Sequence, residues 1–201
     1  MSRIDNNLLV DAGLETMRQS GQPLTKLPAK GRSMLYTLPN GESVRARTCN
    51  DHILIVVASE ETEGARLNIE GTDWLLIVMP ETERTDGKVI VYLVPSKIAA
   101  DAARRTHADW LATNPNTKGS NTTWNLWFDP DGPAKANDFA KKWETYRIPS
   151  DVTTLGVVTV ANSPSGGGGN IKAEVEAARN RVAMVAGVAP EAVKISIDFG
   201  T

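Results

Sequence analysis

The spacing of hydrophobic and polar positions predicts three helices in the first three quarters of the chain. Residues 6–19 carry leucines and a methionine at nearly helical spacing, and Asp5 or Asn6 occupies the expected N-cap position. Residues 133–146 place two aromatic side chains one helical turn apart. The longest helix is expected over residues 96–113, where the apolar stripe comprises Ile98, Ala99, Ala102, Ala103, Thr106 and Trp110.

Period-two alternation and short apolar runs predict the strands. Residues 33–48 combine an extended run, a Pro-Asn-Gly turn and an alternating run, which predicts a hairpin. Residues 73–80 and 88–95 are continuous apolar runs that end at proline, and both are expected as central strands covered on both faces. Residues 52–59 are apolar enough to predict another strand buried on both faces. Residues 123–129 alternate as in a strand with one buried face.

The composition changes after Pro149, where a strand, a glycine-rich loop, a helix and a closing strand are expected. The predicted fold class is α/β. Residues 1–149 are expected to form a core domain with a mixed central sheet of about five or six strands flanked by helices. Residues 150–201 add a C-terminal βαβ extension. Because a segment of about fifty residues buries too little surface to fold alone, we expect this extension to pack on the core.

Composition and charge exclude several classes of protein. Hydrophobic residues make up 41% of the 201 residues and charged residues 23%, as in ordinary soluble globular proteins. The 22 basic and 24 acidic residues give a net charge of -2, so a nucleic-acid partner needs a local basic surface. One cysteine excludes an internal disulfide and a cysteine-based zinc site. No apolar run approaches the ~20 residues that span a bilayer, and we expect a bacterial, cytoplasmic protein with no membrane partner.

An acidic residue, Asp73, leads the first of the two buried strands. The order helix, hairpin, acid-led strand, buried strand, helix and strand over residues 6–128 resembles the core of the PD-(D/E)XK nuclease-like superfamily. The resemblance implies that Asp73 and Glu15 hold a Mg²⁺ ion. It also implies that Lys97 is the catalytic lysine that positions the attacking water.

The chain departs from the family pattern on the second buried strand. A Glu-x-Lys or Asp-x-Lys motif belongs there, but Tyr92 and Val94 occupy the region and Lys97 follows a proline. The resemblance therefore implies a degenerate core that has lost cleavage and retains nucleic-acid binding. The alternative is that Asp73 only marks where a strand begins at the edge of the sheet.

Basic and aromatic residues cluster on the helix at 96–113, the strand at 123–129 and the helix at 133–146. Such residues form the grooves that hold single-stranded nucleic acids, because cations follow the phosphates and aromatic rings stack on bases. The candidate nucleic-acid-binding residues are Arg104, Arg105, His107, Trp127, Lys141, Lys142 and Arg147. Acidic residues are interleaved with them, and this pattern is also typical of solvated helix faces with local ion pairs.

Two short motifs remain. A glycine-rich turn before a helix can bind a phosphate through backbone N–H groups, although no Walker pattern is present; a surface loop is the alternative. This candidate phosphate loop consists of Gly166, Gly167, Gly168, Gly169 and Asn170. Cys49, Asp51 and His52 lie close together in the sequence, and we expect a strand end and a turn there rather than a nucleophilic pair.

Three functions follow from these features. The first is nucleic-acid binding by a degenerate, non-cleaving nuclease-like core. The second is a self-associating protein-interaction module with Trp127 in its interface, since Trp127 alternates out of phase with the core-facing positions of its strand. The third is a metal-dependent hydrolase that uses Asp73 with Glu15 or Glu70. No cofactor is assigned, and Mg²⁺ follows only if the metal site is functional.

Overall fold

The computed structural model describes residues 3–28, 34–60, 62, 64–114, 122–129, 138–154, 175, 179 and 189–194. Contacts divide the chain into two units, residues 1–157 and 158–201. The second unit contributes one described element, the 3₁₀ helix η3 (Pro190–Ala192). The glycine-rich loop lies outside the described residues, and so does most of the helix expected after it. No described helix has the length and apolar character needed to cross a membrane.

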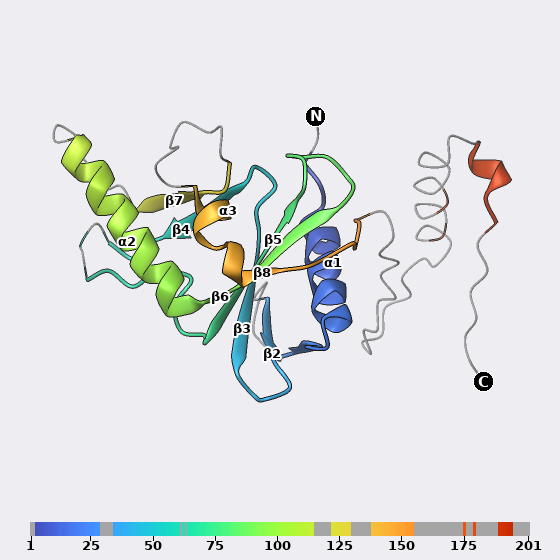
Figure 1. Cartoon of the computed structure of the whole chain (residues 1–201), viewed down its shortest axis with the longest axis horizontal. Coiled ribbons are helices and arrows are strands. Elements are labelled where there is room, and N and C mark those ends of the chain that lie inside the picture. Colours follow the sequence, from blue (N-terminus) through green and yellow to red (C-terminus); the bar gives the residue numbers. More distant parts are fainter. Residues whose placement is uncertain are drawn as a thin grey trace. The chain divides into compact units, whose positions relative to one another are not determined.

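The first unit is built on a six-stranded mixed sheet, which confirms the predicted α/β class (Figure 1). The strand order is β1-β2-β3-β5-β6-β8. Strands β3 and β5 are parallel, and every other neighbouring pair is antiparallel. The strands are β1 (Thr25–Lys26), β2 (Leu35–Thr37), β3 (Ser43–Thr48), β5 (Trp74–Pro80), β6 (Val89–Pro95) and β8 (Arg147–Ile148).

Helix α1 (Asn6–Gln19) covers one face of this sheet. The Asp5 carboxylate accepts a hydrogen bond from the Asn7 N–H at 2.8 Å, which confirms Asp5 as the N-cap. The helix packs so closely on β5 that a Cβ atom at Gly13 would overlap the Cγ2 methyl group of Val78. The core on this side joins α1 to β3, β5 and β6 and includes Leu9, Met17, Val44, Ala46, Leu76, Val78 and Val91.

We expect Gly13→Ala to destabilise the protein by roughly 1 kcal/mol. Overpacking costs about 1–3 kcal/mol, and the better helix propensity of alanine offsets about 1 kcal/mol of that cost. Urea denaturation followed by circular dichroism measures the change. Gly64→Ala is the matched control, because a Cβ at Gly64 meets nothing within 4 Å. Equal stabilities for the two variants would contradict the close approach of α1 to β5.

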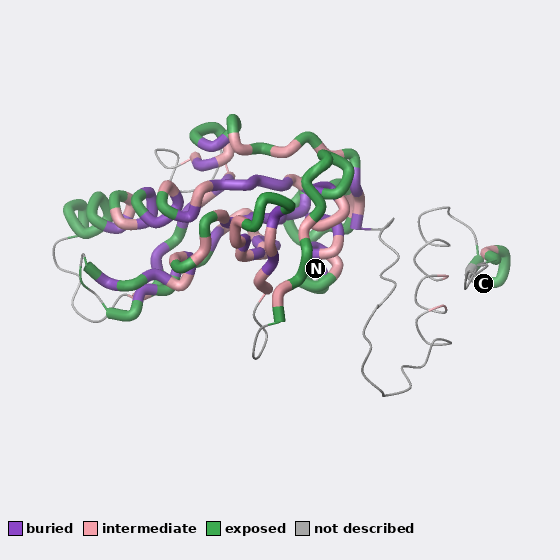
Figure 2. Tube along the Cα trace, turned by 90° about the horizontal axis from the view of Figure 1, so that it is seen from below, coloured by how far each residue is buried: buried purple, intermediate pink, exposed green. Residues whose placement is uncertain are grey.

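The opposite face of the main sheet is covered by helix α2 (Ser96–Thr113) and by a second sheet. Helix α2 has the predicted bounds, and its buried and exposed residues alternate around the helix (Figure 2). The second sheet has two antiparallel strands, β4 (Ile53–Val57) and β7 (Thr123–Trp127). The core on this side joins both sheets to α2 and to the short helix α3 (Phe139–Lys142).

Two sequence-based expectations need correction here. The strand predicted at 52–59 is β4, and its residues alternate between buried and exposed instead of being buried on both faces. The alternation arises because β4 pairs with β7 outside the main sheet and packs on the core through one face only. The helix predicted over 133–146 is also shorter where it is described. Helix α3 ends at Lys142, and a 3₁₀ turn, η2 (Glu144–Tyr146), follows.

The chain directly after Pro149 remains part of the first unit. The Val89 N–H donates to the Val152 carbonyl oxygen at 3.1 Å, and the Thr154 N–H donates to the Gly87 carbonyl oxygen at 2.9 Å. Val152 and Thr154 are buried. Residues 150–154 are therefore part of the first unit. The packing of a C-terminal βαβ extension on the core stays a prediction.

Candidate functional site

Asp73 ties the start of β5 to the start of β3. The Ser43 N–H and the Ser43 hydroxyl both donate to Asp73 Oδ2, at 2.8 and 2.6 Å, and the Asp73 N–H donates back to Ser43. These hydrogen bonds from Ser43 lower the pKa of the exposed Asp73 carboxyl group. The geometry gives Asp73 a structural contact at the point where the two parallel strands enter the sheet.

The other residues expected at a metal site have partners of their own. Glu15 on α1 binds the Arg18 guanidinium at 2.7 Å, and the hydrogen bonds from Arg18 and Gln19 lower its pKa to about 2. Glu70 forms an ion pair at 2.8 Å with Arg104 of α2. Lys97 lies exposed on the first turn of α2. Within the described part of the chain, no three His, Cys, Asp or Glu side chains form a group that could hold a metal ion.

We expect Asp73→Ala to lower the melting temperature at neutral pH. The native pKa is depressed, so the stabilisation exists above the unfolded pKa of about 3.9 and disappears as the pH falls through the native value. The difference in free energy of unfolding between wild type and variant should therefore shrink as the pH is lowered. Denaturation series at several pH values measure it. A Mg²⁺-dependent rise in melting temperature that is absent from Asp73→Ala would instead identify Asp73 as a metal ligand.

Two residues of the predicted nucleic-acid surface are used inside the fold. Arg104 on α2 forms the ion pair with Glu70 and donates to the Ala65 carbonyl oxygen at 3.0 Å. His107 is buried and stacked, with ring centroids 4.3 Å from Trp124 and 5.9 Å from Trp110. Arg104 therefore anchors the segment before β5 to α2, and His107 joins α2 to β7.

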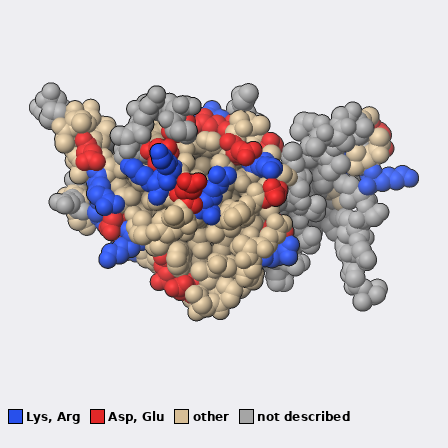
Figure 3. Space-filling model, viewed as in Figure 1, with Lys and Arg blue, Asp and Glu red and all other residues tan. Residues whose placement is uncertain are grey.

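The remaining predicted cations are exposed but do not form a uniform basic surface. Arg105, Lys141, Lys142 and Arg147 are all exposed, and the Lys142 Nζ lies 5.0 Å from the centroid of the Phe139 ring. On the face seen in Figure 3, basic and acidic side chains lie interspersed over the region of α3 and β8. This face therefore carries charges of both signs, and nucleic-acid binding by the exposed cations stays a prediction.

The Cys49, Asp51 and His52 segment lacks the features of a nucleophilic site. Cys49 is buried, and burial raises the pKa of its thiol to about 12, which opposes formation of the thiolate. Asp51 binds the guanidinium groups of Arg3 and Arg84. His52 Nε2 lies 2.6 Å from the Pro80 carbonyl oxygen. The segment forms the turn that the sequence predicted. Its contacts join this turn to a residue near the N-terminus, to the end of β5 and to the turn after β5.

The β4–β7 sheet has one face in the core and one facing outward. Leu54, Val56, Trp124 and Leu126 are buried in the core next to α2 and the main sheet. The alternate residues point the other way and pair across the two strands, Ile53 with Trp127, Ile55 with Asn125 and Val57 with Thr123. We call these six residues the outer face.

Four of the six outer-face residues are apolar, and none of the six is charged. Ile55 and Val57 are 45% and 42% exposed, which makes them the two most exposed large hydrophobic residues among those described. Ile53 and Trp127 are half-buried. The outer face therefore has an aliphatic stripe along β4 and, along β7, two polar residues followed by a tryptophan. Since contiguous exposed apolar patches mark interaction sites, the outer face is a candidate interaction surface.

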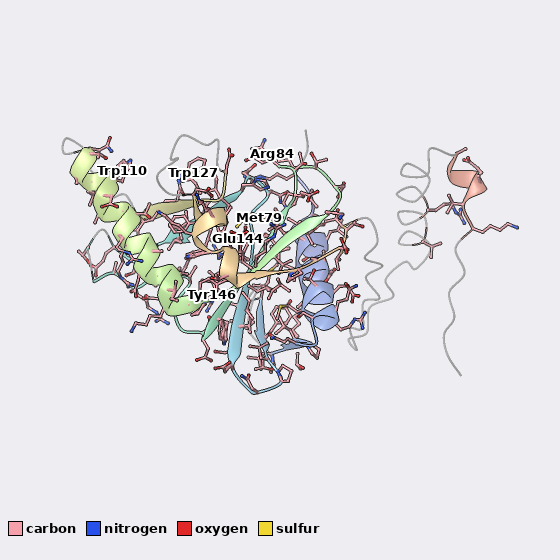
Figure 4. All side chains as sticks on the ribbon, in the orientation of Figure 1. Met79, Arg84, Trp110, Trp127, Glu144 and Tyr146 are labelled. Carbon is pink, nitrogen blue, oxygen red and sulfur yellow. The ribbon has the colours of Figure 1, made fainter. Side chains whose placement is uncertain are left out.

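Sequence reasoning found Asn125 and Trp127 of the outer face but missed the residues of β4. The alternation in residues 123–129 predicted the outward position of Trp127, whereas the unbroken apolar run at 52–59 concealed Ile55 and Val57. The exposed Trp110 and Leu111 lie on α2, toward its C-terminal end. Figure 4 shows Trp110 there, apart from Trp127 at the end of β7.

Comparisons of the chain with protein-family models, with curated proteins and with solved structures found no match.

Proposed function

We propose that this chain is a protein-interaction domain that self-associates through the outer face of the β4–β7 sheet. The exposure of Ile55 and Val57, side by side on an uncharged strand face, carries the proposal. Because a little under half of each side chain is exposed, covering it contributes roughly 1 kcal/mol per residue. A sheet face that leaves such residues in solvent gains this energy when another surface covers it.

The chemistry of the outer face favours a second copy of the chain as the occupant. A two-fold interface places the same patch of two copies together, so a charged residue near the two-fold axis would meet its own charge. The outer face has no such charge, and its aliphatic stripe on β4 can pack on the same stripe of another copy. Thr123 and Asn125 supply the polar groups beside this stripe, as at the rim of many interfaces.

The other two functions have weaker support. Nucleic-acid binding by a nuclease-like core stays a prediction that would depend on the exposed Arg105, Lys141, Lys142 and Arg147. A metal-dependent hydrolase requires a set of carboxylates, and the described residues gather none. For these reasons, self-association is the function we put forward.

Hydroxyl-radical footprinting at several protein concentrations tests the proposal directly. Oxidation of Trp127 should fall as the concentration rises, because the second copy covers the outer face. Trp110 is the internal control, since it is 38% exposed and lies on α2 instead. Equal oxidation of Trp127 at all concentrations, together with a monomeric mass, would overturn the proposal.

A further inference from the structure

Two arginines lie side by side on strand β3. Val44 and Ala46 are buried against α1, so the residues between and after them, Arg45 and Arg47, project from the opposite face of the sheet. In the strand register, Arg45 lies between Leu35 of β2 and Leu75 of β5. Arg47 lies next to Ile77 of β5. Both arginines are half-buried.

These arginines have few partners for their charge. The Arg47 Nη2 donates to the Ile55 carbonyl oxygen at 3.0 Å. The Arg45 Nε is buried and has no hydrogen-bond acceptor. No described carboxylate forms an ion pair with either side chain. Burial lowers the pKa of Arg47, and the neighbouring positive charge of Arg45 lowers it further.

Two adjacent, half-buried positive charges without a carboxylate are unfavourable. Partial burial weakens their hydration, and the two guanidinium groups repel each other. Folded proteins usually relieve such a cost with a paired anion that accepts the remaining hydrogen bonds. The unused Nε of Arg45 shows that the fold itself does not supply all of these acceptors.

We propose that Arg45 and Arg47 bind the phosphate group of an anionic ligand. Guanidinium groups bind phosphate through paired hydrogen bonds, and two of them match the double charge of a phosphate better than that of a single carboxylate. Leu35 and Leu75 flank Arg45 and reduce contact with water, which strengthens the attraction between unlike charges. The site is separate from the outer face, although Arg47 touches the backbone of Ile55.

Isothermal titration of the full chain with inorganic phosphate, at constant ionic strength set with chloride, tests this site. Saturable binding is expected for the wild type, weakened roughly tenfold or more in Arg45→Gln, since the substitution removes charge-assisted hydrogen bonds to the phosphate. Arg105→Gln, which removes an exposed arginine of α2, should bind like the wild type. Arg45→Gln is the deciding variant because the Arg45 Nε makes no hydrogen bond that folding could depend on.

Further titrations distinguish the sources of the phosphate group. A nucleoside monophosphate and a short single-stranded oligonucleotide are titrated in parallel with inorganic phosphate. Tighter binding of the oligonucleotide that is lost in Arg45→Gln identifies a nucleic-acid backbone as the source. Binding of the monophosphate alone identifies a small ligand. Absence of phosphate binding to the wild type, or equal binding by Arg45→Gln, overturns the proposal. Repeating the titration with Val57→Asp, which changes the outer face at a residue other than the one whose carbonyl binds Arg47, should leave phosphate binding unchanged and so separates this result from self-association.

Discussion

Replacing Trp124 by alanine is expected to lower the free energy of unfolding by about 3–5 kcal/mol. Trp124 is 4% exposed, belongs to the core that joins the two sheets, and stacks on His107 of α2. Its removal leaves a cavity between β7 and α2, and it removes the aromatic contact that connects them. Urea denaturation of dilute protein, monitored by far-ultraviolet circular dichroism, measures the loss.

Trp127→Ala is the matched control for this prediction, because both tryptophans lie on β7 and occupy opposite faces of the β4–β7 sheet. In dilute protein, Trp127→Ala should cost about 1 kcal/mol or less, as for other residues away from the core. If the two variants lost similar stability, the assignment of an inner and an outer face to the β4–β7 sheet would be wrong.

Replacing Ile55 by aspartate is expected to weaken self-association by about a hundredfold or more. The substitution puts a charge at the centre of the aliphatic stripe, and the two-fold interface places it near its own copy. A hot-spot residue at the centre of an interface contributes about 2 kcal/mol or more, and a buried unpaired charge adds to this loss. Sedimentation equilibrium over a range of concentrations gives the dissociation constant.

Leu111→Asp provides the matched control for Ile55→Asp. Leu111 is 37% exposed, close to the 45% of Ile55, but it belongs to α2 and not to the outer face. The same change of chemistry at Leu111 should leave the dissociation constant unchanged. An equal effect at both positions would show that association depends on general surface hydrophobicity and not on this face.

Local sequence patterns predicted the elements whose burial follows from the order of neighbouring residues. The run at 73–80 became β5 and the run at 88–95 became β6, because each is apolar throughout and ends at a proline. Helix α2 has the bounds that its stripe of small apolar residues indicated. The hairpin also formed as predicted, with β2 and β3 on either side of the Pro-Asn-Gly turn.

Pairings between distant segments could not be predicted in the same way. Strand β4 leaves the main sheet because it pairs with β7, about seventy residues later, and no local pattern encodes that partner. The ion pair between Arg104 and Glu70 likewise depends on how α2 crosses the segment before β5. The sequence marked Arg104 as a surface cation, whereas the fold uses it internally. The roles assigned to the basic candidate residues therefore changed most between the sequence and the structure.

Asp73 shows how a correct local prediction can leave two interpretations open. The sequence predicted an acid at the start of a strand, and the structure has it directly before β5. The hydrogen bonds from Ser43 to its carboxylate join two parallel strands, and this structural contact accounts for an acid at the position. The described residues form no group of side chains that could hold a metal ion. The resemblance to a nuclease-like core stays a prediction.

The mass of the chain in solution as a function of concentration, measured for wild type and Ile55→Asp in parallel, tests the central claim most directly. We predict that the wild-type mass rises from that of a 21.7 kDa monomer to twice this value, while the variant stays monomeric over the same range. A wild-type chain that remains monomeric at every concentration would contradict self-association through the outer face. A dimer that Ile55→Asp leaves intact would place the interface elsewhere.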